Sequence, residues 1–273
     1  MATIPLSDRS FSRIARLMHG SVGLSYGPNK KSLMHSRLAG RLQRLGLRGF
    51  DDYVDLLESA DDGGEFQMAV DLLTTNETYF FREPAHFALL QAELQRTRPQ
   101  QLAVWSAASS FGDEAYSTAM LLADLEMMGC IGPDWSVLGT DISERVLQSA
   151  VQGIYPADRL RDVTPQRLKR HCLRGEGDSE GLVQMRETLR ERVRFGQLNL
   201  CAAIEPLGPF DVVFLRNVLL YFDAKTKSAV VDRVLAQLRP GGLFFLGTAE
   251  GRVPCKTPLT VLAPGAFRKE TRP

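Results

Sequence analysis

The chain has few cysteines and histidines, and their scatter excludes several classes of site. Its 273 residues include four of each, and no two cysteines form a CxxC pair. Structural zinc sites need closely spaced ligands, so we expect neither a metal site nor a disulfide framework. No apolar run approaches the length of a membrane span, and the N-terminus lacks a signal-peptide pattern. We therefore expect a cytoplasmic protein without direct membrane insertion.

The chain also lacks a glycine-rich loop for phosphate. The segment SAASSFGDEAYS, after the first expected strand, holds one glycine, Gly112, and no G-x-G-x-x-G pattern. Dinucleotide sites use such glycines to bring the backbone against a pyrophosphate, so a nicotinamide dehydrogenase is disfavoured. Asp113 and Glu114 open the next helix instead. Carboxylates there would repel phosphates and would suit a ligand with an ammonium and a sulfonium, such as S-adenosylmethionine.

Charge is unevenly distributed over the first 71 residues, although the net charge is only +1. Residues 1–50 hold nine Lys or Arg and one acid, and residues 51–71 hold eight acids without any Lys or Arg. Four arginines repeat at helical spacing beside a stripe of apolar residues. This arginine row consists of Arg37, Arg41, Arg44 and Arg48. The pattern predicts a helix that packs through its leucines and presents the row to an acidic partner, or a basic face that is only solvated.

Hydrophobic patterns predict a helical N-terminal part and an α/β part. Residues 1–75 favour a small helical bundle without strand candidates. From residue 99, strands alternate with helices, which predicts a doubly wound parallel sheet covered on both faces. The expected strands are 101–108, 135–141, 210–217 and 241–250, and the expected helices are 114–129, 143–153 and 224–238. Such sheets bind ligands at the carboxyl ends of their strands.

One segment interrupts this pattern. Residues of about 155–200 contain strand candidates near 169–173 and 181–186, which predicts an inserted antiparallel β-subdomain rather than one long loop. The second expected strand ends at Asp141, which we expect to hold ribose hydroxyls, although a helix N-cap is the alternative.

Five segments, in order, give the chain a resemblance to a known family. They are LTTNETYFFRE, WSAASSFGDEAYS, GTDIS with VLQSAVQGIY, FDVVFLRNVLLYFD and LRPGGLFFLGTAE. Together they resemble the signatures of the chemoreceptor glutamate O-methyltransferases, the CheR family, over nearly the whole chain. The resemblance implies a helical N-terminal domain at 1–75 and an interdomain segment at 76–98. It also implies a Rossmann-like S-adenosylmethionine methyltransferase domain at 99–273, with the inserted β-subdomain inside it.

The resemblance implies S-adenosylmethionine as the methyl donor and no metal. Glu114 would face the methionine amino group, Asp141 the ribose, and Asn199 with Leu200 the adenine. The other residues expected around the donor are Asn76, Thr78, Arg82, Arg216 and Asn217. The expected catalytic residues are Arg82, which would orient the acceptor carboxylate, and Tyr221.

The resemblance also implies partners. In the family, the N-terminal helices meet the acidic methylation region of a chemoreceptor, so the arginine row would bind that substrate here. Some relatives also bind a tethering peptide from the receptor C-terminus on the β-subdomain. A nucleic-acid methyltransferase is disfavoured because the chain has no basic patch interleaved with aromatics.

Two of the departures from the family pattern bear on activity. Phe111 stands where a Thr is usual, which predicts a bulky ring beside the donor, and Thr248 stands where a His is usual. Both departures favour the alternative function, a signalling adaptor of the same fold that is weak or inactive as an enzyme.

Overall fold

Four helices form the N-terminal part of the computed structural model, which describes residues 4–59 and 62–271. They are α1 (Asp8–Val22), α2 (Lys31–Leu45, preceded by the 3-10 turn η1, Pro28–Lys30), α3 (Phe50–Leu57) and α4 (Glu65–Leu73). The Ser7 side chain accepts a hydrogen bond from the Ser10 N–H and caps α1. Gly23 and Gly46 end α1 and α2 in the left-handed conformation, which glycine adopts without steric cost.

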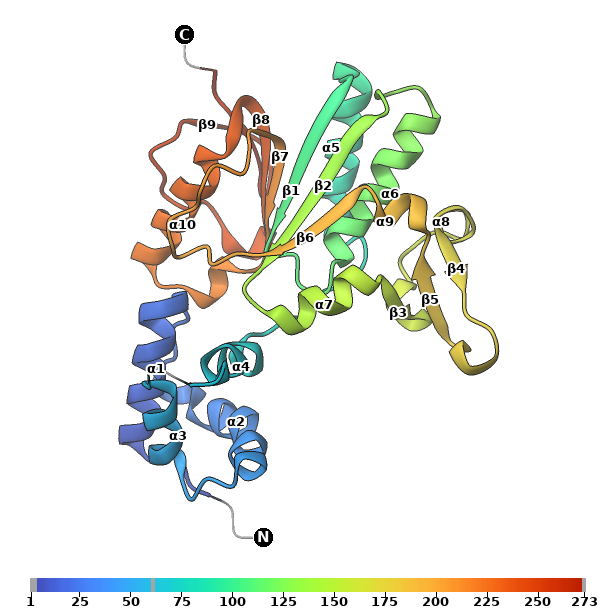
Figure 1. Cartoon of the computed structure of the whole chain (residues 1–273). Coiled ribbons are helices and arrows are strands. Elements are labelled where there is room, and N and C mark those ends of the chain that lie inside the picture. The colour runs from blue at the N-terminus through green and yellow to red at the C-terminus, as the bar shows by residue number, and fades with distance from the viewer. Residues whose placement is uncertain (1–3, 60–61, 272–273) are drawn as a thin grey trace.

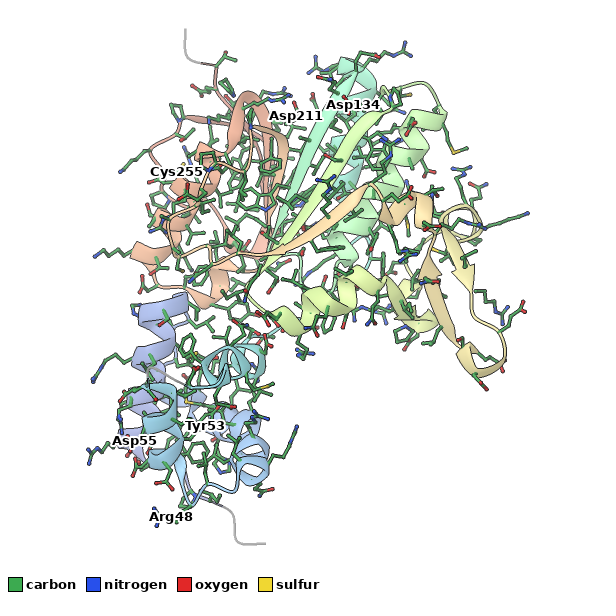
Figure 2. All side chains as sticks on the ribbon, viewed as in Figure 1. Arg48, Tyr53, Asp55, Asp134, Asp211 and Cys255 are labelled. Atoms are coloured by element: carbon green, nitrogen blue, oxygen red, sulfur yellow. The ribbon has the colours of Figure 1, made fainter. Side chains whose placement is uncertain are left out.

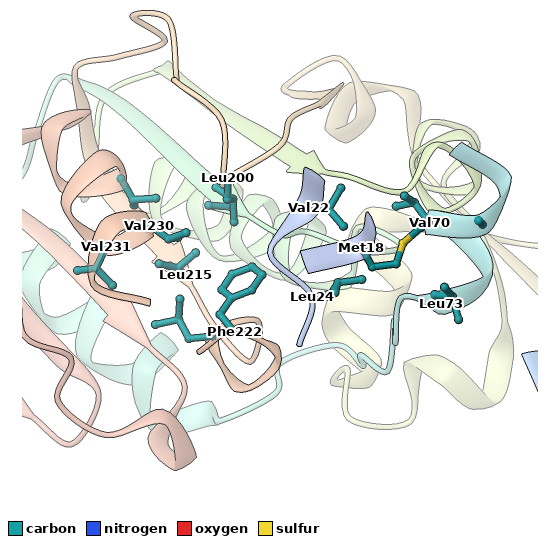
Figure 3. Close-up of a cluster of buried hydrophobic side chains, with 14 of the residues drawn as sticks. Met18, Val22, Leu24, Val70, Leu73, Leu200, Leu215, Phe222, Val230 and Val231 are labelled. Carbon is teal, nitrogen blue, oxygen red and sulfur yellow. The ribbon is translucent and has the colours of Figure 1, made fainter. Parts of the chain in front are cut away.

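The apolar stripe of α2 faces inward as its spacing predicts. Met34, Leu38 and Leu42 are fully buried, whereas Leu45 at the end of the helix is 37% exposed. The core of these helices continues into the core of the sheet domain (Figure 3). In that core Met18 and Val22 of α1 belong to the same cluster as Leu200 and Phe222. The helical part and the sheet are therefore packed against each other through apolar side chains.

A seven-stranded mixed sheet forms the centre of the remaining chain, in the order β6-β2-β1-β7-β8-β10-β9 (Figure 1). The first five strands in that order pair in parallel, and β10 and β9 complete one edge in antiparallel fashion. The bounds are β1 Gln101–Ala107, β2 Asp134–Asp141, β6 Val193–Gln197, β7 Phe210–Leu215, β8 Leu238–Leu246, β9 Leu259–Ala263 and β10 Ala266–Lys269.

Helices cover both faces of this sheet. Phe80, α5 (Pro84–Thr97) and α6 (Asp113–Met127) share a buried cluster with Val104 and Phe214 on one face. On the other face, α10 (Ala224–Ala236) packs with Trp105 and Phe244. α7 (Glu144–Gln152) follows β2. The doubly wound α/β architecture predicted from the alternating pattern is confirmed.

A separate three-stranded antiparallel sheet, in the order β3-β5-β4, projects from one side (Figure 1). Its strands are β3 Ile154–Pro156, β4 Cys172–Arg174 and β5 Leu182–Met185, with the short helices η2 Ala157–Leu160, α8 Pro165–His171, η3 Gly177–Ser179 and α9 Glu187–Arg190. Arg167 and His171 of α8 bond Asp124 of α6 at 2.7 and 3.0 Å and attach this β-subdomain to the main body.

The sheet contains three strands that the sequence patterns do not predict. β6 lies inside the segment of about 155–200 that the patterns assign to the insertion, yet it pairs with β2 in the main sheet. β9 and β10 are short and partly exposed, so neither shows a buried apolar run. None of the helices in the described ranges combines the length and apolarity that crossing a membrane requires.

Candidate active site

A cavity lies where the carboxyl ends of β1, β2, β6 and β7 face the N-terminal helices. Asp134 and Asp211, at the starts of β2 and β7, mark the opposite end of the sheet (Figure 2). All ten residues that the sequence analysis assigns to donor binding or catalysis line this one cavity, which we call the donor cavity. They are Asn76, Thr78, Arg82, Glu114, Asp141, Asn199, Leu200, Arg216, Asn217 and Tyr221.

Glu114, in the first turn of α6, is held by two partners. Its Oε1 accepts a hydrogen bond from the Ser106 hydroxyl at 2.6 Å, and its Oε2 lies 3.1 Å from Arg216 Nη1. Burial raises the pKa of Glu114, and the charge of Arg216 opposes that rise. This partly buried carboxylate retains lone pairs for an ammonium group of a ligand.

Arg216 is a buried cation between two carboxylates. Its side chain is 2% exposed, and it lies 3.1 Å from Glu114 and 3.8 Å from Glu83. Its Nη2 also donates to the backbone carbonyl of Arg82, which fixes the interdomain segment to the end of β7. The Arg216 Nε has no hydrogen-bond partner, and neither does the hydroxyl of Ser109, another lining residue. Buried polar atoms of this kind fit a polar ligand that would complete their hydrogen bonds.

Asp141, at the end of β2, fixes the loop after β1. Its Oδ2 accepts the Ser110 N–H at 2.9 Å, and its Oδ1 accepts the Ser143 N–H at 3.0 Å. Burial raises the pKa of Asp141, while these backbone hydrogen bonds favour the charged form. A carboxylate offers about four lone-pair sites, so Asp141 retains acceptor capacity that suits a ribose hydroxyl.

The interdomain segment combines packing and polar contacts. Phe80 is fully buried and Phe81 nearly so, and the Phe81 N–H donates to the Ser117 hydroxyl at 2.9 Å. Glu83 has a left-handed backbone with φ of 57°, directly before Pro84 opens α5. Arg82 donates to the Glu77 carbonyl at 2.9 Å. The aromatic residues therefore fasten the segment, and its polar residues line the cavity.

The N-terminal helices complete the cavity wall. Asn199 donates to the Ser21 carbonyl at 2.7 Å, and the Ser25 N–H donates to the Tyr221 carbonyl at 2.9 Å. Val22 and Leu24 line the cavity directly. A sequence pattern gives no sign of these two residues because they are ordinary apolar positions at a helix end. Ser109 and Ser110 also line the cavity. Their place just after the first expected strand could have marked them, because such sheets bind ligands at the carboxyl ends of their strands.

The arginine row does not present one uniform face. Arg37 donates to the carbonyls of Leu73 and Thr74 at 2.6 and 2.9 Å and to the Thr75 hydroxyl at 2.9 Å. It therefore holds the residues that lead from α4 into the interdomain segment. The spacing of the row predicts only a surface role for Arg37 and carries no sign of these internal contacts.

The other three arginines of the row also differ among themselves. Arg41 makes a two-pronged contact with Glu65, which is 4% exposed and accepts a further hydrogen bond from Tyr53. Arg44 is exposed, and the Arg48 side chain is 93% exposed with a 3.5 Å contact to Asp52. Figure 2 shows Arg48 at the end of the helices that is farthest from the sheet. Arg44 and Arg48 are thus the two members available to a partner.

The two departures from the family pattern lie outside the donor cavity. Among the described residues that line it, neither Phe111 nor Thr248 occurs. The Phe111 ring instead lies 4.6 Å from the Arg159 guanidinium and 5.4 Å from that of Arg145. The prediction of a bulky ring beside the donor is therefore wrong for this structure. The ring points toward the β-subdomain, since the loop turns there through a left-handed Ser110.

The described part of the chain provides no ready set of metal ligands. Within residues 4–59 and 62–271, no three His, Cys, Asp or Glu side chains are grouped as a metal ion requires.

Two family descriptions match successive parts of the chain. The family described as "CheR methyltransferase, all-alpha domain" matches residues 9–74, and "CheR methyltransferase, SAM binding domain" matches residues 76–261. The chain is 44% identical to the chemotaxis protein methyltransferase of Escherichia coli K12, over 90% of this chain and 86% of that protein. It is 41% identical to chemotaxis protein methyltransferase 2 of Pseudomonas aeruginosa PAO1, over 89% and 86%.

Proposed function

The chain belongs to the CheR methyltransferase family, and from this membership we propose that it methylates glutamate side chains of chemoreceptor cytoplasmic domains. It is an S-adenosylmethionine-dependent methyltransferase. The relatives are named for chemotaxis, which supports chemoreceptors as the substrate. The observation that carries the proposal is the convergence of ten residues from separate segments on one cavity at the carboxyl edge of the sheet.

The donor fits the polar groups of the cavity. Glu114 would hold its ammonium, Asp141 its ribose hydroxyls, and Asn199 with Leu200 its adenine. When bound, S-adenosylmethionine supplies a methyl group on a positively charged sulfur. The carboxylates of Glu114 and Asp141 attract that positive charge. The loop after β1 lacks the glycine pattern that would bind a phosphate there instead.

The reaction requires little from the protein beyond the positioning of the donor and the acceptor carboxylate. A glutamate acceptor is ionised at neutral pH, so its oxygen needs no general base before it attacks the methyl carbon. Within the described part of the chain, no histidine lines the cavity, which agrees with a reaction that removes no proton. Catalysis then rests on orientation and on charges fixed in advance.

Arg82 and Tyr221 are the residues we propose for that orientation. Arg82 is half-buried at the cavity, and its guanidinium lies 5.7 Å from the Tyr79 ring. Its remaining N–H groups are free to form charge-assisted hydrogen bonds with the acceptor carboxylate. Tyr221 lines the same cavity and would place the reacting groups.

A methyl-transfer assay tests these assignments. The protein would be incubated with labelled donor and a chemoreceptor cytoplasmic domain, and initial rates compared for wild type, Arg82→Ala and Tyr221→Phe. We expect both variants to lose most of the transfer rate. Full transfer by both, with unchanged donor binding, would remove the two residues from the mechanism.

The second candidate, an inactive signalling adaptor, loses the features that favoured it. Phe111 and Thr248 lie outside the donor cavity, so neither occupies the place of the donor. The relatives at 41–44% identity are named as methyltransferases.

The β-subdomain is the proposed place for a receptor tethering peptide. Three of its apolar side chains are exposed: Ile154 at 43%, Leu173 at 44% and Leu182 at 37%. Its outer strands β3 and β4 each pair on one side only within the described sheet, so a peptide strand can add to an edge. Titration with a receptor C-terminal peptide tests this, and Leu173→Asp should weaken the binding.

A further inference from the structure

The β-subdomain touches the loop after β1 through an ion pair. Arg159, in η2, donates from Nε and Nη2 to the two carboxylate oxygens of Asp113 at 2.7 and 2.9 Å. Asp113 is 0% exposed and opens α6, one residue before Glu114. The side chain of Arg159 is 23% exposed, so the contact is shielded from solvent on the Asp113 side.

The same subdomain also contacts Phe111 in this loop. The Arg159 guanidinium lies 4.6 Å from the Phe111 ring centroid, within the range of a cation–π contact. The Tyr155 hydroxyl donates to the Phe111 carbonyl at 2.7 Å. Two residues of the β-subdomain thus hold both the backbone and the side chain of Phe111, as well as the carboxylate of Asp113.

The loop needs such external support because its backbone is strained. Ala108 and Ser110 have φ of 81° and 51°, in the left-handed region that non-glycine residues seldom occupy. Such conformations persist only when their surroundings fix them. Asp141 fixes Ser110 from the sheet side, and Arg159 with Tyr155 fixes the residues that follow. The loop and the helix behind it supply Ser109, Ser110 and Glu114 to the donor cavity.

We infer that Arg159 is a positioning residue for the methyl donor. It does not line the donor cavity, but it holds residues 108–114 in the shape that binds S-adenosylmethionine. The inference rests on the proposed function, since it concerns the donor of that same reaction. It also gives Phe111 a role. The ring that replaces the family's usual Thr provides a face for the Arg159 guanidinium.

Calorimetry with S-adenosylhomocysteine tests the inference without any acceptor. Arg159→Met should raise the dissociation constant about tenfold, the loss expected when contacts of this kind are removed. In the transfer assay, the KM for the donor should rise by the same factor while the KM for the receptor domain stays unchanged. A purely structural role would move the melting temperature without separating the two KM values.

Two control variants separate positioning from a loss of charge or of subdomain attachment. Arg161→Met removes an arginine of the same segment whose side chain is 75% exposed. Arg170→Met removes an arginine that joins the β-subdomain to Asp124, farther along α6. Both should bind S-adenosylhomocysteine as wild type does. An equal loss of affinity in Arg170→Met would overturn a specific role for Arg159.

A double variant separates a loss of donor affinity from a loss of fold stability. Arg159→Met leaves the buried Asp113 carboxylate without its partner, which destabilises a fold. Arg159→Met with Asp113→Asn removes that unpaired charge and should recover the melting temperature while the dissociation constant stays raised. Recovery of both the melting temperature and the dissociation constant in the double variant would overturn the inference. Wild-type affinity in Arg159→Met would overturn it as well. If the wild-type protein binds no S-adenosylhomocysteine, the proposed function itself fails and this inference fails with it.

Discussion

The donor cavity and the arginine row differ in how their charges are arranged along the chain. The cavity gathers side chains from distant segments, such as Arg82, Glu114 and Arg216, into one set of contacts. The row has four arginines at helical spacing, yet Arg37 and Arg41 contact their own domain while Arg44 and Arg48 are exposed, and Arg48 lies beyond the end of α2 at Leu45. Regular spacing fixes the side of a helix on which a residue lies. It does not determine which partner that residue has.

Glu114→Gln should have the largest effect and would show whether the cavity charges act on the donor. A neutral amide retains the size of the side chain but loses the charge that holds an ammonium. Hydrogen bonds to charged groups contribute about 2 kcal/mol, so the dissociation constant for S-adenosylhomocysteine should rise about thirtyfold. Calorimetry measures this, with circular dichroism as the control for folding. Unchanged affinity would place the ammonium elsewhere.

Acid should weaken donor binding through the same carboxylate. Because burial raises the pKa of Glu114, the group protonates at a higher pH than an exposed Glu. The charged form dominates above this raised pKa, so affinity should be constant well above it and fall as the pH drops through it. The folded protein binds this proton more tightly than the unfolded chain, so this protonation favours folding.

The pH prediction is checked by calorimetry in a series of buffers. Glu114→Gln should show a weaker pH dependence than wild type, with the remaining part due to Asp141, whose pKa burial also raises. An identical pH profile in the variant would exclude Glu114 as the titrating group.

Arg41→Ala should destabilise the fold and would show that this member of the row is structural. Glu65 is 4% exposed and would lose its cationic partner. Leaving a buried charge unpaired costs several kcal/mol, which we reduce to about 2 kcal/mol because the Arg41 side chain is 25% exposed. Urea denaturation measures the change. Arg44→Ala is the matched control and should stay within about 0.5 kcal/mol of wild type.

Reversing the exposed half of the row should slow methylation without destabilising the protein. Arg44→Glu with Arg48→Glu places two negative charges where an acidic receptor surface would approach. We expect the rate at low salt to fall about tenfold, and the deficit to shrink as salt screens the charges. Rates across a salt series test this. A rate that is indifferent to the double reversal would mean that the basic face is only solvated.

Thr248→His should have the smallest effect. Thr248 is exposed and lies outside the donor cavity, so restoring the family's usual His should change donor affinity by no more than about twofold. A much larger gain in calorimetry would mean that this position reaches the donor after all.

Sequence patterns predicted the elements with strong periodicity and the residues at strand ends. β1, β2 and β7, together with α6, α7 and α10, lie close to their predicted ranges because each carries a clear apolar pattern. β8 begins earlier than predicted, at Leu238, and includes Arg239 and Pro240. The resemblance to a family, rather than periodicity, supplied Asn76, Thr78 and Arg82.

The patterns could not predict contacts that only the tertiary fold creates. Nothing near Arg37 in the sequence shows that the helix lies against Leu73 and Thr74. The orientation of Phe111 depends on the turn at Ser110 and on Arg159, which is 48 residues away along the chain. These are long-range packing outcomes, for which local spacing carries no signal.

The most direct test of the central claim is to map the methyl groups that the protein adds. A chemoreceptor cytoplasmic domain would be incubated with the protein and labelled S-adenosylmethionine, and the modified peptides identified by mass spectrometry. The account predicts base-labile methyl esters on glutamate side chains, present with wild type and strongly reduced with Glu114→Gln. Stable methylation of another residue type, or no transfer to any chemoreceptor domain, would contradict it.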